Sequence, residues 1–169
     1  ARSIRNARRG MIHTSIATSP LHRRMKLGMN RREVLARAVE AVKCALHHAP
    51  CVEIGAEDAS RTEIDFLVEF CAAVTDAGAA VVNISDTVGF AQPAEFARLV
   101  RHLHDAVPAF AEKSARISVH CHNDLGLAAA NTLAGIEGGA SQIEVTIGGV
   151  GERAGNAALE EIAACLDAR

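Results

Sequence analysis

Two histidines one residue apart, His120 and His122, are the side chains of this sequence best suited to metal chemistry. Polar and apolar residues alternate around them, as they do in a β-strand, and residues two apart on a strand point to the same face. Both imidazoles would therefore approach one point, as two ligands of a divalent metal must. The same spacing also occurs where two polar side chains simply line a solvated face of a sheet, so the spacing alone leaves both interpretations open.

A third candidate ligand is Asn156, which ends the sequence Gly-Glu-Arg-Ala-Gly-Asn at residues 151–156. Its amide offers an oxygen atom, and the glycines of this loop would let the backbone pass close to a substrate or a metal. Asp124 could also supply a carboxylate ligand. It stands just before a predicted helix, however, where we expect an aspartate to cap the first turn, and Asn123 to serve the same turn.

Length and composition predict one globular domain. The chain has 169 residues, 49% of them hydrophobic, and a formal net charge of −2. These values argue against disorder and against a nucleic-acid partner. No apolar run has the length of a membrane span, and no secretory signal is apparent, so we expect no membrane partner. Five scattered cysteines without a CxxC pair suggest reduced thiols, mostly in the core, and a cytoplasmic location.

Strand and helix patterns alternate along the chain. Apolar, β-branched runs predict strands at residues 11–17, 51–55, 80–85, 116–121 and 142–147. Amphipathic patterns predict a helix that begins at Pro93 and others at residues 31–48, 63–77, 125–137 and 155–166. This alternation predicts an α/β fold with parallel strands and right-handed crossovers. We expect a single domain over residues 1–169, in which residues 1–10 are the tail of a preceding helix or loop.

Each predicted strand has one polar and one apolar face. In the strand at 116–121, for example, Ser118 and His120 alternate with Ile117 and Val119. Central strands of a sheet covered by helices on both faces are apolar throughout, so the alternation favours a barrel whose polar residues line the interior. Five βα units are fewer than the eight that close such a barrel. The sequence therefore predicts a partial (β/α)8 TIM barrel with two exposed sheet edges.

Five motifs, in order and in spacing, resemble the α-isopropylmalate synthase family. They are residues 13–22 (His-Thr-Ser-Ile-Ala-Thr-Ser-Pro-Leu-His), 57–61 (Glu-Asp-Ala-Ser-Arg), 86–89 (Asp-Thr-Val-Gly), 120–126 (His-Cys-His-Asn-Asp-Leu-Gly) and 151–157 (Gly-Glu-Arg-Ala-Gly-Asn-Ala). The resemblance implies barrel units 4–8 of a TIM-barrel acyltransferase that condenses acetyl-CoA with a 2-oxo acid. In leucine biosynthesis this acid is 3-methyl-2-oxobutanoate.

The resemblance also implies a metal centre. His120 and His122 would bind a divalent metal (Mg²⁺, Mn²⁺ or Zn²⁺) that chelates the 2-oxo acid. Asn156 would be a further ligand or lie close beside the ligands. The family's opening motif, Asp-Thr-Thr-Leu-Arg-Asp-Gly, does not occur in this sequence. Its carboxylate ligand and its arginine are therefore missing, and neutral imidazole and amide ligands alone should bind Mg²⁺ or Mn²⁺ weakly.

Three further residues fall at positions that line the substrate pocket in the family. Glu57 and His13 are the candidates for catalysis, and Thr87 and His13 are those for substrate binding. Each also has an ordinary structural interpretation. Glu57 could be a solvated loop acid, Thr87 could close a turn, and His13 could be a hydrogen-bonded interior histidine. One departure from the family is Gly55-Ala56, where Ser-Pro is usual, and it removes a hydroxyl near the pocket.

These expectations leave several functions open. The first is a 2-isopropylmalate synthase barrel that is inactive alone, or active as a homodimer or with a chain that carries the missing units. The second is a non-catalytic remnant or a dimerising module. The third is a related enzyme, either a citramalate or homocitrate synthase or a lyase of the hydroxymethylglutaryl-CoA type. The Gly-Glu-Arg-Ala-Gly-Asn loop argues against the lyase, which tends to carry a cysteine there.

Overall fold

The computed structural model describes residues 2–4 and 6–168, and its centre is one parallel sheet. The strands lie in chain order across the sheet. They are β1 (Met11–Ala17), β2 (Cys51–Glu57), β3 (Val81–Asp86), β4 (Arg116–Cys121) and β5 (Gln142–Glu144). Every neighbouring pair is parallel, as the alternation of strand and helix patterns predicts.

Helices follow each strand. They are α1 (Pro20–His22), α2 (Arg31–Leu46), α3 (Ile64–Asp76), α4 (Pro93–Ala106), α5 (Pro108–Ala111), α6 (Ala128–Gly138) and α7 (Leu159–Asp167). A π-helical segment, Arg23–Leu27, links α1 to α2, and short 3-10 turns lie at Arg2–Ile4, Ala59–Arg61 and Ile147–Gly149. Among the described residues, no helix has the length and apolarity needed to cross a bilayer.

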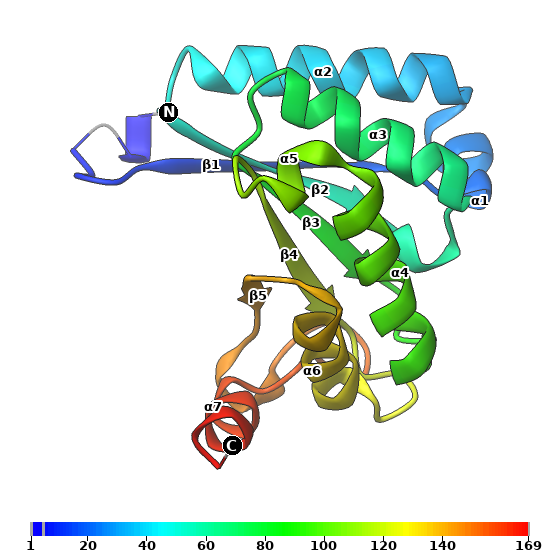
Figure 1. The fold of residues 1–169 in the computed structure, drawn as a ribbon, viewed down its shortest axis with the longest axis vertical. Coiled ribbons are helices and arrows are strands. Elements are labelled where there is room, and N and C mark those ends of the chain that lie inside the picture. Colours follow the sequence, from blue (N-terminus) through cyan, green and yellow to red (C-terminus); the bar gives the residue numbers. More distant parts are fainter. Residues whose placement is uncertain (1, 5, 169) are drawn as a thin grey trace.

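The hydrophobic core lies between the sheet and one layer of helices. Figure 1 shows α2, α3, α4 and α6 along the same side of the curved sheet. Apolar residues from alternate strand positions, such as Ile54 and Ile84, pack there against Phe70 and Phe96 from the helices, and all four are buried. Each fully buried side chain of this size contributes about 1.5–3 kcal/mol to folding. The apolar faces of the strands are therefore buried against the helices.

The other face of the sheet is polar and concave. Gln142 on β5 donates its Nε2 hydrogens to both carboxylate oxygens of Glu53 on β2, at 3.0 and 2.9 Å. Glu144 on β5 reaches His13 on β1, with 3.2 Å between Oε1 and Nδ1. Strands that are not neighbours in the sheet thus touch through their side chains, because the sheet curls as a barrel wall does. This architecture confirms the predicted partial barrel.

Several predicted elements are longer than the structure makes them, most clearly the last strand and the last helix. The strand predicted at 142–147 ends at Glu144, because Thr146 instead forms a bridge with Ala158. The helix predicted from residue 155 begins only at Leu159, because the residues before it form these bridges. All five cysteines are free, and Cys71 and Cys121 are the buried ones, so the expectation that most lie in the core is wrong.

Candidate active site

A concave pocket of about 340 Å³ opens on the polar face, where the carboxyl ends of the strands meet. Active sites of (β/α) barrels occupy this end of the strands. Of the six residues singled out from the sequence, all but Asn156 line the pocket. Its lining consists of His13, Ser15, Lys26, Gly55, Glu57, Asn83, Ser85, Thr87, His120, His122, Glu144 and Glu152.

His120 and His122 point their ring nitrogens at each other. The two Nε2 atoms are 3.3 Å apart, and the ring centroids are 5.0 Å apart. Imidazole nitrogens bind divalent metals at about 2.0–2.2 Å, so a single ion can bind both atoms at this separation. The convergence expected from the spacing is therefore present, while metal ligation itself stays a prediction.

Asn156 lies beside this pair through the backbone. It forms an isolated antiparallel bridge with His122, and the next residue, Ala157, donates its N–H to the carbonyl of Cys121 at 3.1 Å. The Asn156 Nδ2 group donates to the carbonyl of Val150, but its Oδ1 is buried without a hydrogen-bond partner among the described residues. A buried amide oxygen without a partner is costly. A cation would satisfy it, so this donor set fits a divalent metal.

Glu144 is the main residue of the pocket that sequence reasoning missed. Its Oε2 lies 2.8 Å from Nδ1 of His120, and its Oε1 lies 3.2 Å from Nδ1 of His13. Burial opposes ionisation of Glu144, but hydrogen bonds from His120 and His13 outweigh it and lower its pKa to about 2. The polarity of residue 144 was visible in the sequence, but its pairing with His120 depends on the register of β4 and β5.

The surrounding charges favour a neutral His122. Burial lowers its pKa, and the neighbouring His120 and Arg153 lower it further. A neutral imidazole is the form that binds metals. The hydrogen bond to Glu144 instead raises the pKa of His13, against the effect of burial.

A second cluster lies beneath the histidine pair. Ligand atoms of His13, Glu53 and Glu144 all lie within 4.8 Å of one another. Burial raises the pKa of Glu53, and the charge of Glu144 adds to this effect. Both oxygens of Glu53 accept hydrogen bonds from Gln142. The cluster is therefore better described as a hydrogen-bonded network that adjoins the pocket than as a cation site.

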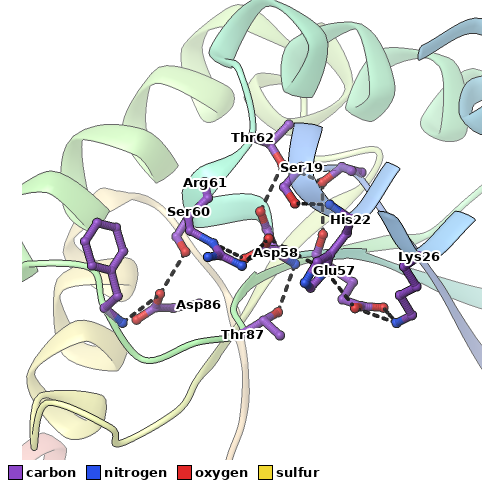
Figure 2. A network of polar contacts seen from close by, with 12 residues as sticks. Ser19, His22, Lys26, Glu57, Asp58, Ser60, Arg61, Thr62, Asp86 and Thr87 are labelled. Atoms are coloured by element: carbon purple, nitrogen blue, oxygen red, sulfur yellow. Dashed lines mark hydrogen bonds and ion pairs between the residues drawn. The ribbon is translucent and has the colours of Figure 1, made fainter. Parts of the chain in front are cut away.

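Glu57 lies at the rim of the pocket beside basic side chains of α1 and of the π-helical segment that follows it. Lys26 donates to both carboxylate oxygens, at 2.7 and 2.8 Å, and Figure 2 shows His22 directed at the same carboxylate. The Nδ1 of His22 lies 3.1 Å from Oε1 of Glu57, although without the angle of a hydrogen bond. Lys26 belongs to the π-helical segment Arg23–Leu27, a type of turn that often occurs at functional sites. Lys26 was not anticipated, because no sequence pattern indicates that it faces Glu57.

Thr87 joins two loops and also lines the pocket. Its Oγ1 accepts the backbone N–H of Asp58 at 2.8 Å (Figure 2), and Asp58 has a left-handed backbone with φ of 63°. The turn at residues 86–89 is closed by the N–H of Gly89, which donates to the carbonyl of Asp86 at 3.1 Å, and the bond from Asp58 to Thr87 instead links the loops that follow β2 and β3. This bond uses only a lone pair of the hydroxyl, so its hydrogen is free to bind a substrate oxygen.

Asp124 pairs with an arginine and does not cap the helix that follows it. Arg153 donates to both of its oxygens, at 2.7 and 2.8 Å, and also donates to the carbonyl of Thr87 at 2.8 Å. This pairing lowers the pKa of Asp124. The expected helix cap is wrong, because α6 begins later and Asn123 accepts the N–H of Ala128 instead. Arg153 thus links the loops that follow β3, β4 and β5.

The comparisons with known proteins agree with this geometry. The sequence model of the HMGL-like family matches residues 1–169. The chain belongs to the HMGL-like family. Among the relatives of this HMGL-like chain are the 2-isopropylmalate synthases of Brevibacillus brevis and Pyrococcus abyssi, each 54% identical over 167 residues and 99% of the chain. The match covers 32% and 34% of these relatives, so the chain spans about a third of their length.

Solved structures place the HMGL-like chain in the same barrel class. Hydroxymethylglutaryl-CoA lyase from Pseudomonas aeruginosa superposes with a TM-score of 0.79 over 94% of this chain and 55% of the lyase, at 19% identity. The carboxyl transferase domain of Rhizobium etli pyruvate carboxylase gives a TM-score of 0.62 at 18% identity, over 76% of this chain and 22% of that one. At such identities the similarity concerns the fold alone.

Proposed function

We propose that this chain carries the metal-binding part of a synthase that condenses acetyl-CoA with a 2-oxo acid, with 3-methyl-2-oxobutanoate as the favoured acceptor. The observation that carries the proposal is the convergence of the two Nε2 atoms of His120 and His122. Asn156, whose backbone forms a bridge with His122, adds an Oδ1 without a hydrogen-bond partner among the described residues. The similarity to 2-isopropylmalate synthases supports this choice among metal-dependent reactions.

His120, His122 and Asn156 would hold the metal. When bound, Mg²⁺, Mn²⁺ or Zn²⁺ supplies a Lewis acid that polarises the carbonyl of the 2-oxo acid. Two imidazoles and one amide contribute no negative charge, which makes a carboxylate ligand from outside this chain desirable. We therefore propose that activity requires the remaining barrel units in addition to residues 1–169. A cytoplasmic location is part of the same proposal.

The other pocket residues would handle the organic substrates. Thr87 and His13 would bind and orient the 2-oxo acid through its oxygen atoms. Glu57 is the candidate to take a proton from the methyl carbon of acetyl-CoA, with His13 as the alternative base. The carbon nucleophile then attacks the keto carbon, and hydrolysis of the thioester releases coenzyme A. The ion pair with Lys26 keeps the Glu57 carboxylate at the pocket rim.

A metal titration tests the proposal first. We expect Mn²⁺ to bind the purified chain, and His122→Ala to weaken binding by more than the roughly 10–100-fold typical of changes outside the ligand set. His102→Ala, on the exposed surface of α4, is the matched control and should bind as the wild type does. If both variants bind Mn²⁺ equally, the metal site is not where we place it.

Turnover separates the remaining alternatives. Thiol release from acetyl-CoA with a panel of 2-oxo acids distinguishes an isopropylmalate synthase from citramalate or homocitrate synthases. Cleavage of hydroxymethylglutaryl-CoA would reveal a lyase instead. A chain that binds no metal and turns over no thioester, even with the remaining barrel units added, would be a non-catalytic remnant or dimerising module.

A further inference from the structure

One carboxylate holds two histidines of the pocket. Glu144 on β5 pairs in register with His120 on β4, and its Oε2 lies 2.8 Å from the Nδ1 of that ring. Its other oxygen lies 3.2 Å from Nδ1 of His13, which belongs to β1 at the opposite edge of the sheet. A single side chain thus joins the candidate metal ligand to the candidate substrate-binding histidine.

These contacts determine where the imidazole hydrogens lie. A carboxylate accepts hydrogen bonds, so both Nδ1 atoms that face Glu144 must carry hydrogen. When both rings are neutral, the Nε2 of His120 presents a lone pair, and His122 donates its own Nε2 hydrogen across the 3.3 Å between them. Nδ1 of His122 is left as a lone pair, in agreement with its lack of a hydrogen-bond partner among the described residues.

We propose that Glu144 is a positioning residue that fixes the Nδ1–H tautomer and the ring orientation of His120, and at the same time the orientation of His13. Metal-binding histidines commonly donate their second ring N–H to a carboxylate, which directs the other nitrogen at the metal. The inference rests on the proposed function in one respect, namely that the atom bound by His120 is a metal ion. The tautomers and orientations belong to the metal-free protein.

On the side of the ring opposite Glu144, a glycine also restricts the position of His13. A Cβ atom at Gly55 would lie 3.2 Å from Nε2 of His13 and 3.1 Å from Cβ of Ser15. Glycine at this position therefore leaves the space that the imidazole occupies. Glu144 contacts the Nδ1 atom of His13, and the missing side chain of Gly55 leaves room for its Nε2 atom. Together these two residues determine how the ring of His13 is oriented in the pocket.

Glu144→Gln tests the inference in the metal-free protein. Long-range ¹H–¹⁵N spectra of the imidazoles should show the Nδ1–H tautomer for His120 in the wild type and a loss of that preference in the variant. Mn²⁺ affinity should fall by about 10–100-fold. Glu161→Gln removes the same charge from an exposed position on α7 and should change neither the tautomer nor the affinity. Glu144→Asp, which keeps a carboxylate, should recover part of both.

The outcomes separate this inference from the proposed function. An unchanged His120 tautomer in a folded Glu144→Gln protein would overturn the positioning role, as would the Nε2–H form in the wild type. If the wild type binds no Mn²⁺ even after the remaining barrel units are added, the proposed function fails, and the tautomer spectra still decide the inference. If circular dichroism shows the glutamine variant to be unfolded, the wild-type spectrum decides: the Nδ1–H form supports the role, and the Nε2–H form overturns it.

Discussion

His13 is a clear case of one contact that controls the ionisation of a side chain. Its pKa is raised by Glu144, whose own pKa is lowered to about 2. A raised histidine pKa favours folding below the unfolded value of 6.5 and loses that effect as the pH rises through the folded pKa. A lowered glutamate pKa favours folding above 4.5 and loses that effect as the pH falls toward about 2. The pair therefore stabilises the fold most between pH 4.5 and 6.5.

This pH range predicts that the loss of stability on removing the imidazole of His13 depends on pH. We expect His13→Asn to lower the melting temperature more at a pH near 5.5 than at a pH near 9, since the raised folded pKa has been passed at the higher value. Differential scanning calorimetry of wild type and variant at both pH values measures this difference. His102→Asn on α4 should show no such dependence. An equal loss at both pH values would contradict the charge pairing of His13.

The orientation of a side chain was predictable where the regular alternation of a strand determines which face it lies on. The two-residue spacing of His120 and His122 was enough to place their rings together, because a strand alternates its faces. Glu144 and Lys26 were missed because their partners are set by strand register and by a π-helical segment. Neither feature leaves a pattern in the sequence. Asp124 was misjudged because the arginine that binds it comes from a distant loop.

At the scale of elements, the close packing of α4 and α6 depends on one small residue. A Cβ atom at Gly138, the last residue of α6, would lie 2.7 Å from the carbonyl oxygen of Ala97 and 2.9 Å from Cβ of Val100, both on α4. We expect Gly138→Ala to destabilise the chain by about 1–3 kcal/mol, since a tightly packed core resists added volume. Urea denaturation measures the change.

The control for this prediction adds one heavy atom elsewhere on the same helix. Ala130→Ser lies on the exposed side of α6 and should change the free energy of unfolding by less than about 0.5 kcal/mol. Equal stability of the two variants would show that α4 and α6 can move apart at little cost.

Strands and helices were predicted well where a regular alternation of apolar and polar residues extends over many positions. They were predicted poorly where the backbone groups form hydrogen bonds with loops instead. The strands at Met11–Ala17 and Arg116–Cys121 agree with the predicted bounds, as does the helix start at Pro93. At the carboxyl end of the chain, residues 145–158 have strand-like and helix-like patterns but pair with one another and with His122. Such pairing depends on the folded arrangement of three loops, which local patterns do not encode.

At the scale of the whole molecule, the sheet has two edges. β1 and β5 are its outermost strands, and β1 alternates exposed and half-buried residues along most of its length. Unpaired backbone groups on such strands favour pairing with another chain. We expect the purified 169-residue chain to self-associate, with an average mass above the 17.8 kDa of one chain in light scattering after size exclusion.

Dilution provides the control for that prediction. Association through sheet edges should weaken as concentration falls, and addition of the remaining barrel units should replace it. A strictly monomeric chain at every concentration would show that the edges are protected. The architecture itself was predictable, because polar residues on one face of each strand are incompatible with a sheet covered on both sides.

The two faces of the sheet are also chemically independent of each other. The helices pack on one face, while Gly55, His13 and their neighbours contact only the hollow on the other. Substitutions near the mouth of the hollow would therefore change the shape of the pocket while the apolar packing between the sheet and the helices is left intact. A scaffold of this kind allows new substrate preferences to evolve without new folding problems.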